Sequence, residues 1–248
     1  MKGSTIIFGC FLWVLLFKAC AEPKAAHQRN GYPDSILVFS KTNGFRHSSI
    51  PDGIKAIKKI GASEGFGVHA TEDSTEFAPE NLKGYKAIVF LNTTGTILGP
   101  AEKKAFENFI RQGGGFLGVH AASDTEYDWP FYEKMVGAQF LSHPKQQDAD
   151  LLVLTKNHPS TSFLPDTWRR WDEWYNFKNL NPAVTVLLKI DENSYKGGAN
   201  GDHHPMSWYH LFEGGRVFYT ALGHTEASYT EPLFVQHLTG GFRYVLGR

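Results

Sequence analysis

The segment from Gly113 to Asp124 constrains the fold of this chain more than any other stretch. Three glycines end an amphipathic helix, an apolar run over 116–119 has the composition of a buried strand, and His120 follows with small residues behind it. Such a sequence is typical of a strand that turns sharply at its C-terminal end. Open α/β sheets usually hold ligands at that end of their strands, so we expect His120 to face a ligand site. The alternative is a core histidine whose ring bonds to the backbone.

Strand and helix patterns alternate along the chain before and after residues 113–124. Short β-rich runs bounded by turn residues predict strands at 35–40, 66–71, 85–92, 184–190 and 217–222. Apolar residues at helical spacing, most of them after a proline, predict helices at 51–60, 100–112, 131–136 and 232–245. The alternation favours one α/β domain over residues 34–248, with three layers and a doubly wound, mostly parallel sheet.

The first 21 residues have the pattern of an export signal. A lysine precedes an apolar run over 6–17 that is too short for a comfortable membrane span. Cleavage after Ala21 would leave a periplasmic or secreted domain, and the alternative is a lipoprotein anchored to the cell surface through Cys20. Residues 22–33 then read as a polar tether. Since both cysteines of the chain, Cys10 and Cys20, lie in the signal, we expect no disulfide in the exported domain.

Composition restricts the partners of the domain. Lys plus Arg and Asp plus Glu each number 25, so the formal net charge is zero and no basic stripe indicates nucleic acid binding. Aromatic residues make up 14% of the chain, and most tryptophans lie in its later part. Aromatic faces in a cleft suit the apolar faces of sugar rings, so we expect Trp174 and Trp208 to stack on a carbohydrate. Core packing is the alternative for either ring.

Histidines and charged residues follow several of the predicted strand ends and gather in the irregular stretches between them. The candidates for a site are Arg46, His47, His120, Asp124, Glu173, His204, His224 and Glu226. Because the C-terminal ends of parallel strands meet at one edge of a sheet, we expect side chains from distant parts of the chain to converge there. An imidazole can accept and return a proton near neutral pH, which suits acid–base chemistry.

Several motifs, in this order, resemble the ThuA (trehalose-utilisation) family. They are Phe45-Arg46-His47, Gly114–Ala121, Asp172–Phe177, His204–Trp208 and Gly215–Thr225. The resemblance covers about residues 35 to 247. It implies a flavodoxin-like layered sheet similar to that of class I glutamine amidotransferases. It also implies a role in sugar catabolism, associated with oxidised (3-keto) disaccharides, and a sugar oxidoreductase or keto-sugar hydrolase in the same pathway.

One departure from the amidotransferases excludes thiol catalysis. Those enzymes carry a nucleophilic cysteine after the central strand, whereas this chain has His120 there and no cysteine beyond Cys20. We therefore predict acid–base chemistry on a keto-sugar, with His120 and His224 as base and acid. Glu173 or Asp124 would orient them or bind hydroxyls. The remaining candidates, Arg46, His47, Trp174, His204, Trp208 and Glu226, are expected to bind substrate.

Three alternatives stay open at this point. The same imidazoles with a carboxylate would suit Zn²⁺ or another divalent ion that polarises the carbonyl, but no close-spaced signature such as H-E-x-x-H is present, and no residue is assigned as a ligand. A pair of carboxylates is the basis of a direct glycosidase. A domain that binds carbohydrate without catalysis is the third alternative. Which of Asp202, His203 and His204 faces the site is also open.

Overall fold

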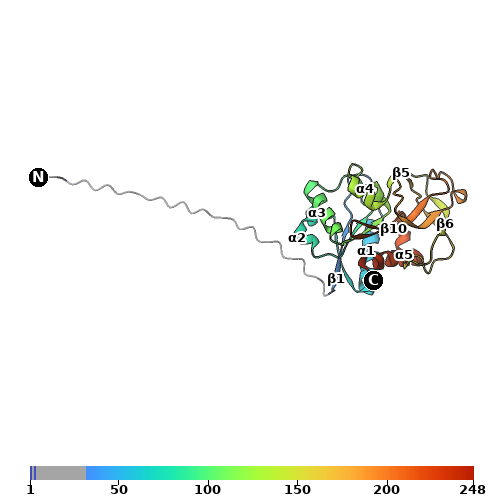
Figure 1. The fold of residues 1–248 in the computed structure, drawn as a ribbon, viewed down its shortest axis with the longest axis horizontal. Coiled ribbons are helices and arrows are strands. Elements are labelled where there is room, and N and C mark those ends of the chain that lie inside the picture. The colour runs from blue at the N-terminus through green and yellow to red at the C-terminus, as the bar shows by residue number, and fades with distance from the viewer. Residues whose placement is uncertain (2, 4–31) are drawn as a thin grey trace.

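The computed structural model describes residues 1, 3 and 32–248 of the chain (Figure 1). Apart from residues 1 and 3, the expected export signal with its Cys20 and residues 22–31 of the expected tether lie outside the described residues. None of the helices in 32–248 combines the length and the hydropathy that a membrane crossing requires.

A nine-stranded mixed sheet organises the domain, in the order β2-β1-β3-β4-β11-β10-β9-β6-β7. The parallel part consists of β1 (Asp34–Phe39), β2 (Phe66–Thr71), β3 (Ala87–Leu91), β4 (Gly115–Val119) and β11 (Gly215–Thr220). The antiparallel part consists of β10 (Pro205–Phe212), β9 (Thr185–Ile190), β6 (Gln147–Val153) and β7 (Thr167–Asp172). Two short strands, β5 (Gln139–Ser142) and β8 (Asn176–Lys178), form a separate antiparallel pair.

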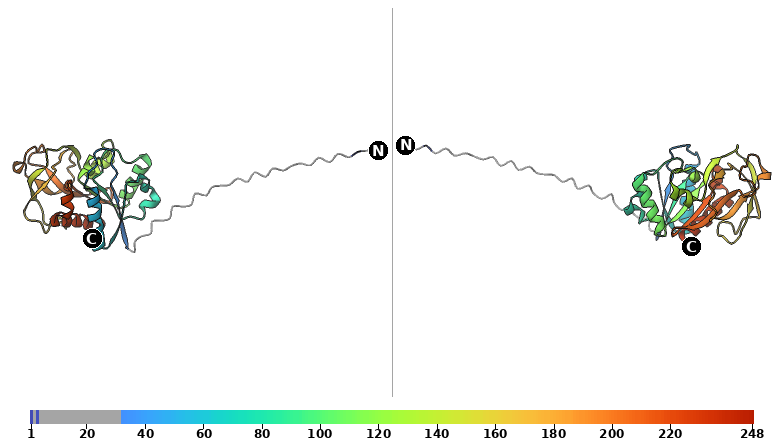
Figure 2. Two further views of the ribbon diagram at one scale, coloured as in Figure 1. Left: turned by 180° about the vertical axis from the view of Figure 1, so that it is seen from behind. Right: turned by 45° about the horizontal axis from the view of Figure 1, so that its top comes forward.

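Helices cover both faces of the parallel part, which gives the domain three layers (Figures 1 and 2). One face carries α1 (Ile50–Glu64) and α5 (Pro232–Leu246), and the other carries α2 (Pro79–Leu82), α3 (Pro100–Arg111) and α4 (Pro130–Val136). Phe116 of β4 packs on α3 and α4, whereas Phe218 of β11, which points to the opposite face, packs on α5. Short 3₁₀ turns complete the described chain: η1 (Ser74–Phe77), η2 (His120–Asp124), η3 (Glu192–Ser194) and η4 (Glu226–Thr230).

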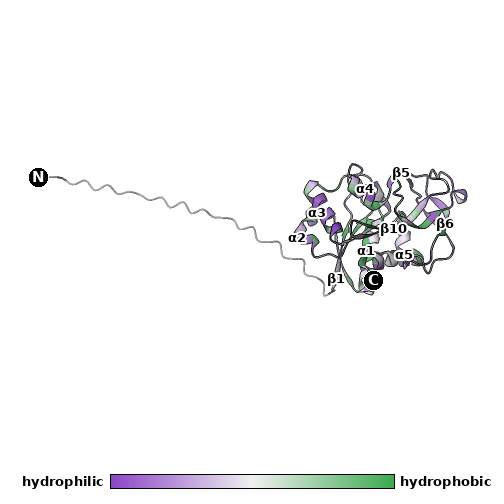
Figure 3. Ribbon diagram, viewed as in Figure 1, coloured by the Kyte–Doolittle hydropathy of each residue, from purple (hydrophilic) through white to green (hydrophobic). Residues whose placement is uncertain are grey.

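The central strands owe their burial to uninterrupted apolar sequence. Every residue of β3 and β4 is buried, as expected for parallel strands covered on both faces. The amphipathic helix α3 turns Phe106 and Ile110 toward them and keeps its charged residues outside. Figure 3 shows the same division, with hydrophobic residues on the central strands and hydrophilic residues on outer helices such as α3. The expected mostly parallel α/β fold is thus confirmed.

The later part of the chain differs from expectation at two places. The sequence predicts a loop that opens at Gly197 and ends in residues 202–208, but Pro205–Phe212 forms β10 in the interior of the sheet. Most of this strand is buried on both faces, so its sequence lacks the alternation that marks a strand. The run 168–177 interleaves charged and aromatic residues, which fits one extended strand, but in the structure β7 ends at Asp172 and β8 begins at Asn176. Glu173 therefore lies in the short connection between β7 and β8.

Candidate functional site

Four side chains from separate elements meet beyond the C-terminal edge of the parallel strands. His47 lies in the loop between β1 and α1, and Glu173 directly follows β7. His120 and His224 lie just beyond β4 and β11, which are neighbours in the sheet. Each of the four offers one ligand atom, and these atoms all lie within 4.8 Å of one another. We refer to these four residues as the His/Glu cluster.

A left-handed backbone turn positions His120. Its φ is 47°, a conformation that is costly for a residue other than glycine. The Tyr219 hydroxyl stabilises the turn by donating a hydrogen bond to the His120 carbonyl at 2.7 Å. Nδ1 of His120 lies 2.6 Å from the carbonyl oxygen of Ala221, which can only accept. Nδ1 therefore carries a proton, and the other ring nitrogen, Nε2, faces the cluster.

Three atoms of the cluster form a nearly equilateral triangle. His120 Nε2 lies 3.2 Å from His224 Nδ1 and 3.4 Å from Glu173 Oε2. His224 Nδ1 lies 3.1 Å from the same carboxylate oxygen. A tetrahedral zinc site with bonds of about 2.0–2.1 Å separates its ligand atoms by roughly 3.3 Å. The three atoms thus have the spacing of one face of a tetrahedral metal site.

His47 brings a fourth ligand group, and one of its buried ring nitrogens lacks a partner in the described part of the chain. Its side chain is buried, and Nδ1 makes no hydrogen bond within the described residues. The ring lies edge-on to those of His120 and His224, with centroids 4.9 Å and 5.0 Å away. Burial, together with the neighbouring histidines, lowers the pKa of His47 to about 2, so the ring is neutral at physiological pH. A neutral imidazole with an unused polar atom suits a metal ligand.

Glu173 supplies the negative charge of the cluster. Burial by itself raises the pKa of this carboxyl, but hydrogen bonds from His120 and His224 outweigh burial and lower it, so the group is ionised. Burial by itself lowers the pKa of His224, but the hydrogen bond to Glu173 outweighs burial and raises the pKa of this imidazole. A proton on His224 can therefore balance the carboxylate, and a divalent cation at the same place would replace that proton.

Asp172 fixes the backbone of two cluster residues with one carboxylate. Its Oδ1 accepts the backbone N–H groups of Glu173 at 3.0 Å and His224 at 3.2 Å, and its Oδ2 accepts that of Gly223 at 3.0 Å. The side chain is fully buried, and Arg170 Nη2 lies 3.0 Å from Oδ2, which compensates its charge. The ends of β7 and β11 are thereby held together below the cluster.

Two residues that sequence reasoning missed approach the cluster from the segment between β5 and β6. His143 Nδ1 lies 3.1 Å from Glu173 Oε1, and the Gln146 amide lies 2.7 Å from His224 Nε2. With its amide oxygen turned toward His224, Gln146 would accept from Nε2–H and direct Nδ1 to the cluster. Neither residue follows a predicted strand, so no pattern in the sequence marks it.

Asp124 and Glu226 lie beside the cluster. Asp124 is half-buried and accepts a hydrogen bond from the Tyr127 hydroxyl at 2.6 Å. Burial raises the pKa of its carboxyl, and the hydrogen bond from Tyr127 and the charges of His120 and His143 only partly offset this effect. Glu226 is exposed and accepts a hydrogen bond from the hydroxyl of Ser48. Both carboxyl groups are therefore placed at the margin of the cluster.

Arg46 stabilises a loop in this structure. Its guanidinium forms two hydrogen bonds with the Glu72 carboxylate, at 2.7 Å and 3.1 Å, and both side chains are about half exposed. The pair links the β1–α1 loop to the residues after β2. Two of its donors are thus engaged with Glu72, and the expected contact between Arg46 and a substrate stays a prediction.

Trp174, Trp208 and His204 lie in the interior of the domain. Both indoles are fully buried, and their N–H groups donate to the backbone carbonyls of Gln147 and Val136. His204 is buried between the Tyr175 carbonyl and Glu192, whereas Asp202 and His203 are exposed outside the cluster. Because these buried side chains present no surface, their positions do not support the expected contacts with a sugar.

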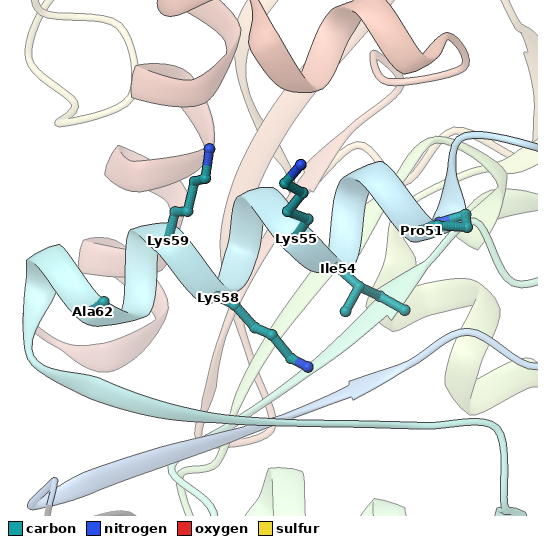
Figure 4. Close-up of a pocket in the computed structure, with 6 residues that line it drawn as sticks. All are labelled: Pro51, Ile54, Lys55, Lys58, Lys59 and Ala62. Atoms are coloured by element: carbon teal, nitrogen blue, oxygen red, sulfur yellow. The ribbon is translucent and has the colours of Figure 1, made fainter.

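A surface hollow of about 510 Å³ runs along α1 and shares no residue with the His/Glu cluster. It is lined by Pro51, Ile54, Lys55, Lys58, Lys59 and Ala62 (Figure 4). These side chains supply ammonium groups and apolar contacts but no imidazole or carboxylate. The cluster is therefore the candidate site for chemistry.

The fold and the site define an α/β domain of the layered, flavodoxin-like kind with a histidine- and carboxylate-lined site at the C-terminal edge of its sheet. The sequence profile of the ThuA family, described as trehalose utilisation, matches residues 35–245. The chain belongs to this family, as its motifs predict. Membership indicates a carbohydrate-related role.

Solved structures share this fold. A ThuA-like protein of Bacteroides uniformis has 24% sequence identity and a TM-score of 0.74, over 90% of this chain and 95% of its own. A ThuA-like protein of Parabacteroides merdae has 20% identity and a TM-score of 0.71, over 87% and 91%. A beta-galactosidase of Bacillus circulans has 12% identity and a TM-score of 0.58, over 87% of this chain and 31% of its own. A comparison with curated protein sequences found no match.

Proposed function

We propose that this protein is a carbohydrate-active enzyme whose His/Glu cluster binds a divalent metal ion, with Zn²⁺ as the best match. The observation that carries the proposal is the triangle of His120 Nε2, His224 Nδ1 and Glu173 Oε2, with sides of 3.1–3.4 Å. Those distances fit tetrahedral zinc, and nitrogen and carboxylate oxygen are ligands that zinc accepts. His47 is the fourth candidate ligand, because it is neutral and its Nδ1 has no hydrogen-bond partner among residues 32–248.

The surroundings of the cluster fit the same role. His120 donates from Nδ1 to a backbone carbonyl, which is the usual outer contact of a metal-bound imidazole. Gln146 is placed to orient His224 in the same way. A zinc ion bound here would polarise the carbonyl of a keto-sugar or lower the pKa of a water molecule.

The chain's own acid–base groups lie around the cluster rather than within it. His120, His224 and Glu173 contact one another through the atoms that would bind the metal. As metal ligands, the two imidazoles would therefore not exchange protons with a substrate. Asp124, whose pKa is raised by burial, and the half-exposed His143 are better placed to move a proton at the substrate. A (3-keto) disaccharide or a related sugar is the substrate class that we propose, on the strength of the family.

A second candidate function is acid–base chemistry without a metal. It is favoured by the raised pKa of His224, which lets this imidazole hold a proton beside Glu173 near neutral pH. In that case His224 would be the acid and His120 the base. Both candidates use the same residues and differ in what balances the Glu173 charge.

We also propose that the protein acts outside the cytoplasm. The support is the charged and apolar pattern of the first 21 residues, with Cys20 as the residue that a lipid would modify. Mass spectrometry of the protein purified from membrane and soluble fractions would reveal cleavage after Ala21, a lipidated Cys20, or an intact N-terminus. An intact N-terminus in every fraction would contradict export.

The experiment that tests the function is incubation with trehalose, sucrose and their 3-keto forms, followed by NMR of the products. We expect turnover of a keto form that stops after chelation and returns when Zn²⁺ is added. Turnover that persists without metal would support the metal-free candidate. No turnover by the zinc-loaded protein on any of these sugars would contradict both candidates for this substrate class.

A further inference from the structure

We propose that Phe45 is an aromatic platform that binds the apolar face of a pyranose ring next to the His/Glu cluster. The inference rests on the proposed function and assigns a substrate-binding residue to the same site. Phe45 takes the role that was expected of Trp174 and Trp208, both of which are buried.

The position of Phe45 combines exposure with contact to the cluster. Its side chain has a relative exposure of 66%, which is unusual for a large apolar residue in the described chain. Its ring packs edge-to-face on His47, with the centroids 4.9 Å apart. Among the exposed large hydrophobic residues of 32–248, Phe45 alone has a ring contact with a cluster member. The phenyl ring therefore lies on the exposed side of His47, next to the cluster.

Hydrogen bonds hold the backbone that carries this ring. The Thr94 hydroxyl donates to the Phe45 carbonyl at 2.9 Å and accepts the Gly44 N–H at 3.2 Å. The Asn43 N–H donates to the Thr94 carbonyl at 2.8 Å. On the other side of Phe45, the paired guanidinium and carboxylate of Arg46 and Glu72 fix the loop. Phe45 is thus exposed on an ordered loop, and such preorganisation reduces the entropic cost of binding.

The chemistry of this rim suits a sugar better than a purely apolar ligand. A phenyl ring offers a flat apolar face that matches the C–H face of a pyranose, and it has no polar atom of its own. Polar groups that can bind hydroxyls lie around the same cluster: Ser48, Asp124, His143 and Glu226. An aromatic plane with a few convergent polar groups is typical of small-molecule sites.

A structural role for Phe45 is the competing explanation, since its edge contact could orient His47 for the metal. The two roles predict different losses. If Phe45 is a platform, its substitution lowers the affinity for sugar and leaves the zinc content unchanged. If Phe45 instead supports His47, its substitution lowers the zinc content.

The experiment uses zinc-loaded protein with trehalose and methyl α-D-glucopyranoside as probes, and compares wild type, Phe45→Ala, Phe45→Trp and Leu211→Ala. Leu211 is a matched control, because it is 71% exposed and pairs with Arg216 near the start of β11, whereas the cluster lies beyond the end of that strand. Affinity is measured by titration calorimetry, and saturation-transfer NMR with irradiation of the aromatic protons maps the sugar face in contact. Zinc content is measured in each sample.

We expect Phe45→Ala to weaken trehalose binding about tenfold and to lose saturation transfer to the pyranose C–H protons, with zinc content unchanged. The affinity of Phe45→Trp for trehalose should lie within about threefold of that of wild type, and the affinity of Leu211→Ala should equal that of wild type. Equal binding by wild type and Phe45→Ala would overturn the platform alone, and so would a loss of zinc in Phe45→Ala. A wild-type protein that binds zinc but neither sugar would overturn the platform together with the proposed carbohydrate function.

Discussion

His120 Nε2 and His224 Nδ1 lie 3.2 Å apart although 104 positions separate these residues in the chain. The reason is the pairing of β4 with β11, in which Val119 and Thr220 are register partners. Both strands run in the same direction, so the residues that leave their C-terminal ends meet at one edge. Asp172 completes the arrangement, because it binds the backbone N–H of His224 and directs Glu173 toward both rings.

Glu173→Gln tests the charge of the cluster. The variant keeps the size of the side chain but removes the anion, so we expect zinc affinity to fall by more than about a hundredfold. In the metal-free protein the pKa of His224 should also fall, because the bond to Glu173 is what keeps it raised against burial. Competition with a chromophoric chelator measures the affinity, and NMR of the imidazole protons across a pH titration measures the pKa.

The matched control for this variant is Glu213→Gln, which removes a carboxylate that pairs with Arg111 at the surface. This control should retain the zinc affinity of wild type. Wild-type zinc affinity in Glu173→Gln would contradict the role of Glu173 as a ligand.

Asp172→Asn tests whether the cluster depends on its buried support. The NH2 group that replaces one carboxylate oxygen cannot accept the N–H that this oxygen accepts in wild type, and Arg170 keeps only Glu231 as a counter-charge. We expect zinc affinity to fall about tenfold to a hundredfold, with a loss of about 1–3 kcal/mol in the free energy of unfolding. Chelator competition and urea denaturation give the two quantities.

The control for Asp172→Asn is Asp150→Asn, which breaks an ion pair with Arg169 that lies at the surface of the same β6–β7 hairpin. Exposed ion pairs contribute little to stability, so this variant should keep both the zinc affinity and the free energy of unfolding of wild type. A zinc affinity in Asp172→Asn equal to that of the control would show that Asp172 does not position the cluster.

His237 makes stability depend on pH. It is fully buried in α5, and burial lowers its pKa from the ordinary 6.5 to about 3. Below about pH 6.5 the unfolded chain binds a proton at this residue and the folded chain does not, so stability is lost as the pH falls. The loss from this residue is about 2 kcal/mol at pH 5 relative to pH 7.

His237→Asn removes this titration and keeps a donor for the Ser160 carbonyl that Nδ1 now contacts. The variant should be less stable than wild type at pH 7, but its unfolding free energy should fall by about 2 kcal/mol less between pH 7 and pH 5. His203→Asn, at an exposed histidine, should leave the pH dependence of wild type. An identical pH dependence in wild type and His237→Asn would refute the assignment.

The parallel half of the fold follows from sequence patterns, and the antiparallel half follows less well. Strands such as β3 are short apolar runs between turn residues, and helices such as α1 begin at a proline and show helical spacing, so their order predicts a doubly wound sheet. The strand β10 was not predicted, because most of it is buried on both faces and its sequence lacks the alternation of polar and apolar residues. Local sequence patterns also do not indicate which strands pair when they lie far apart in the chain.

The same limits apply to the site. His47, His120 and His224 could be predicted as neighbours, because each follows a strand of the parallel sheet. Trp208 could not be distinguished from a ligand-facing ring, because burial depends on the partner elements and not on its own neighbours in sequence. Gln146 belongs to an irregular segment, and its contact with His224 depends on the path of that segment in space.

The most direct test of the account is the zinc content of the purified protein after loading with Zn²⁺ and exhaustive dialysis. We predict about one zinc ion per chain for wild type and for the exposed control His203→Ala, and a loss of most of the zinc in His120→Ala. Circular dichroism of His120→Ala should confirm that the variant remains folded. A folded His120→Ala that retains as much zinc as wild type, or a wild-type protein that retains none, would contradict the metal centre.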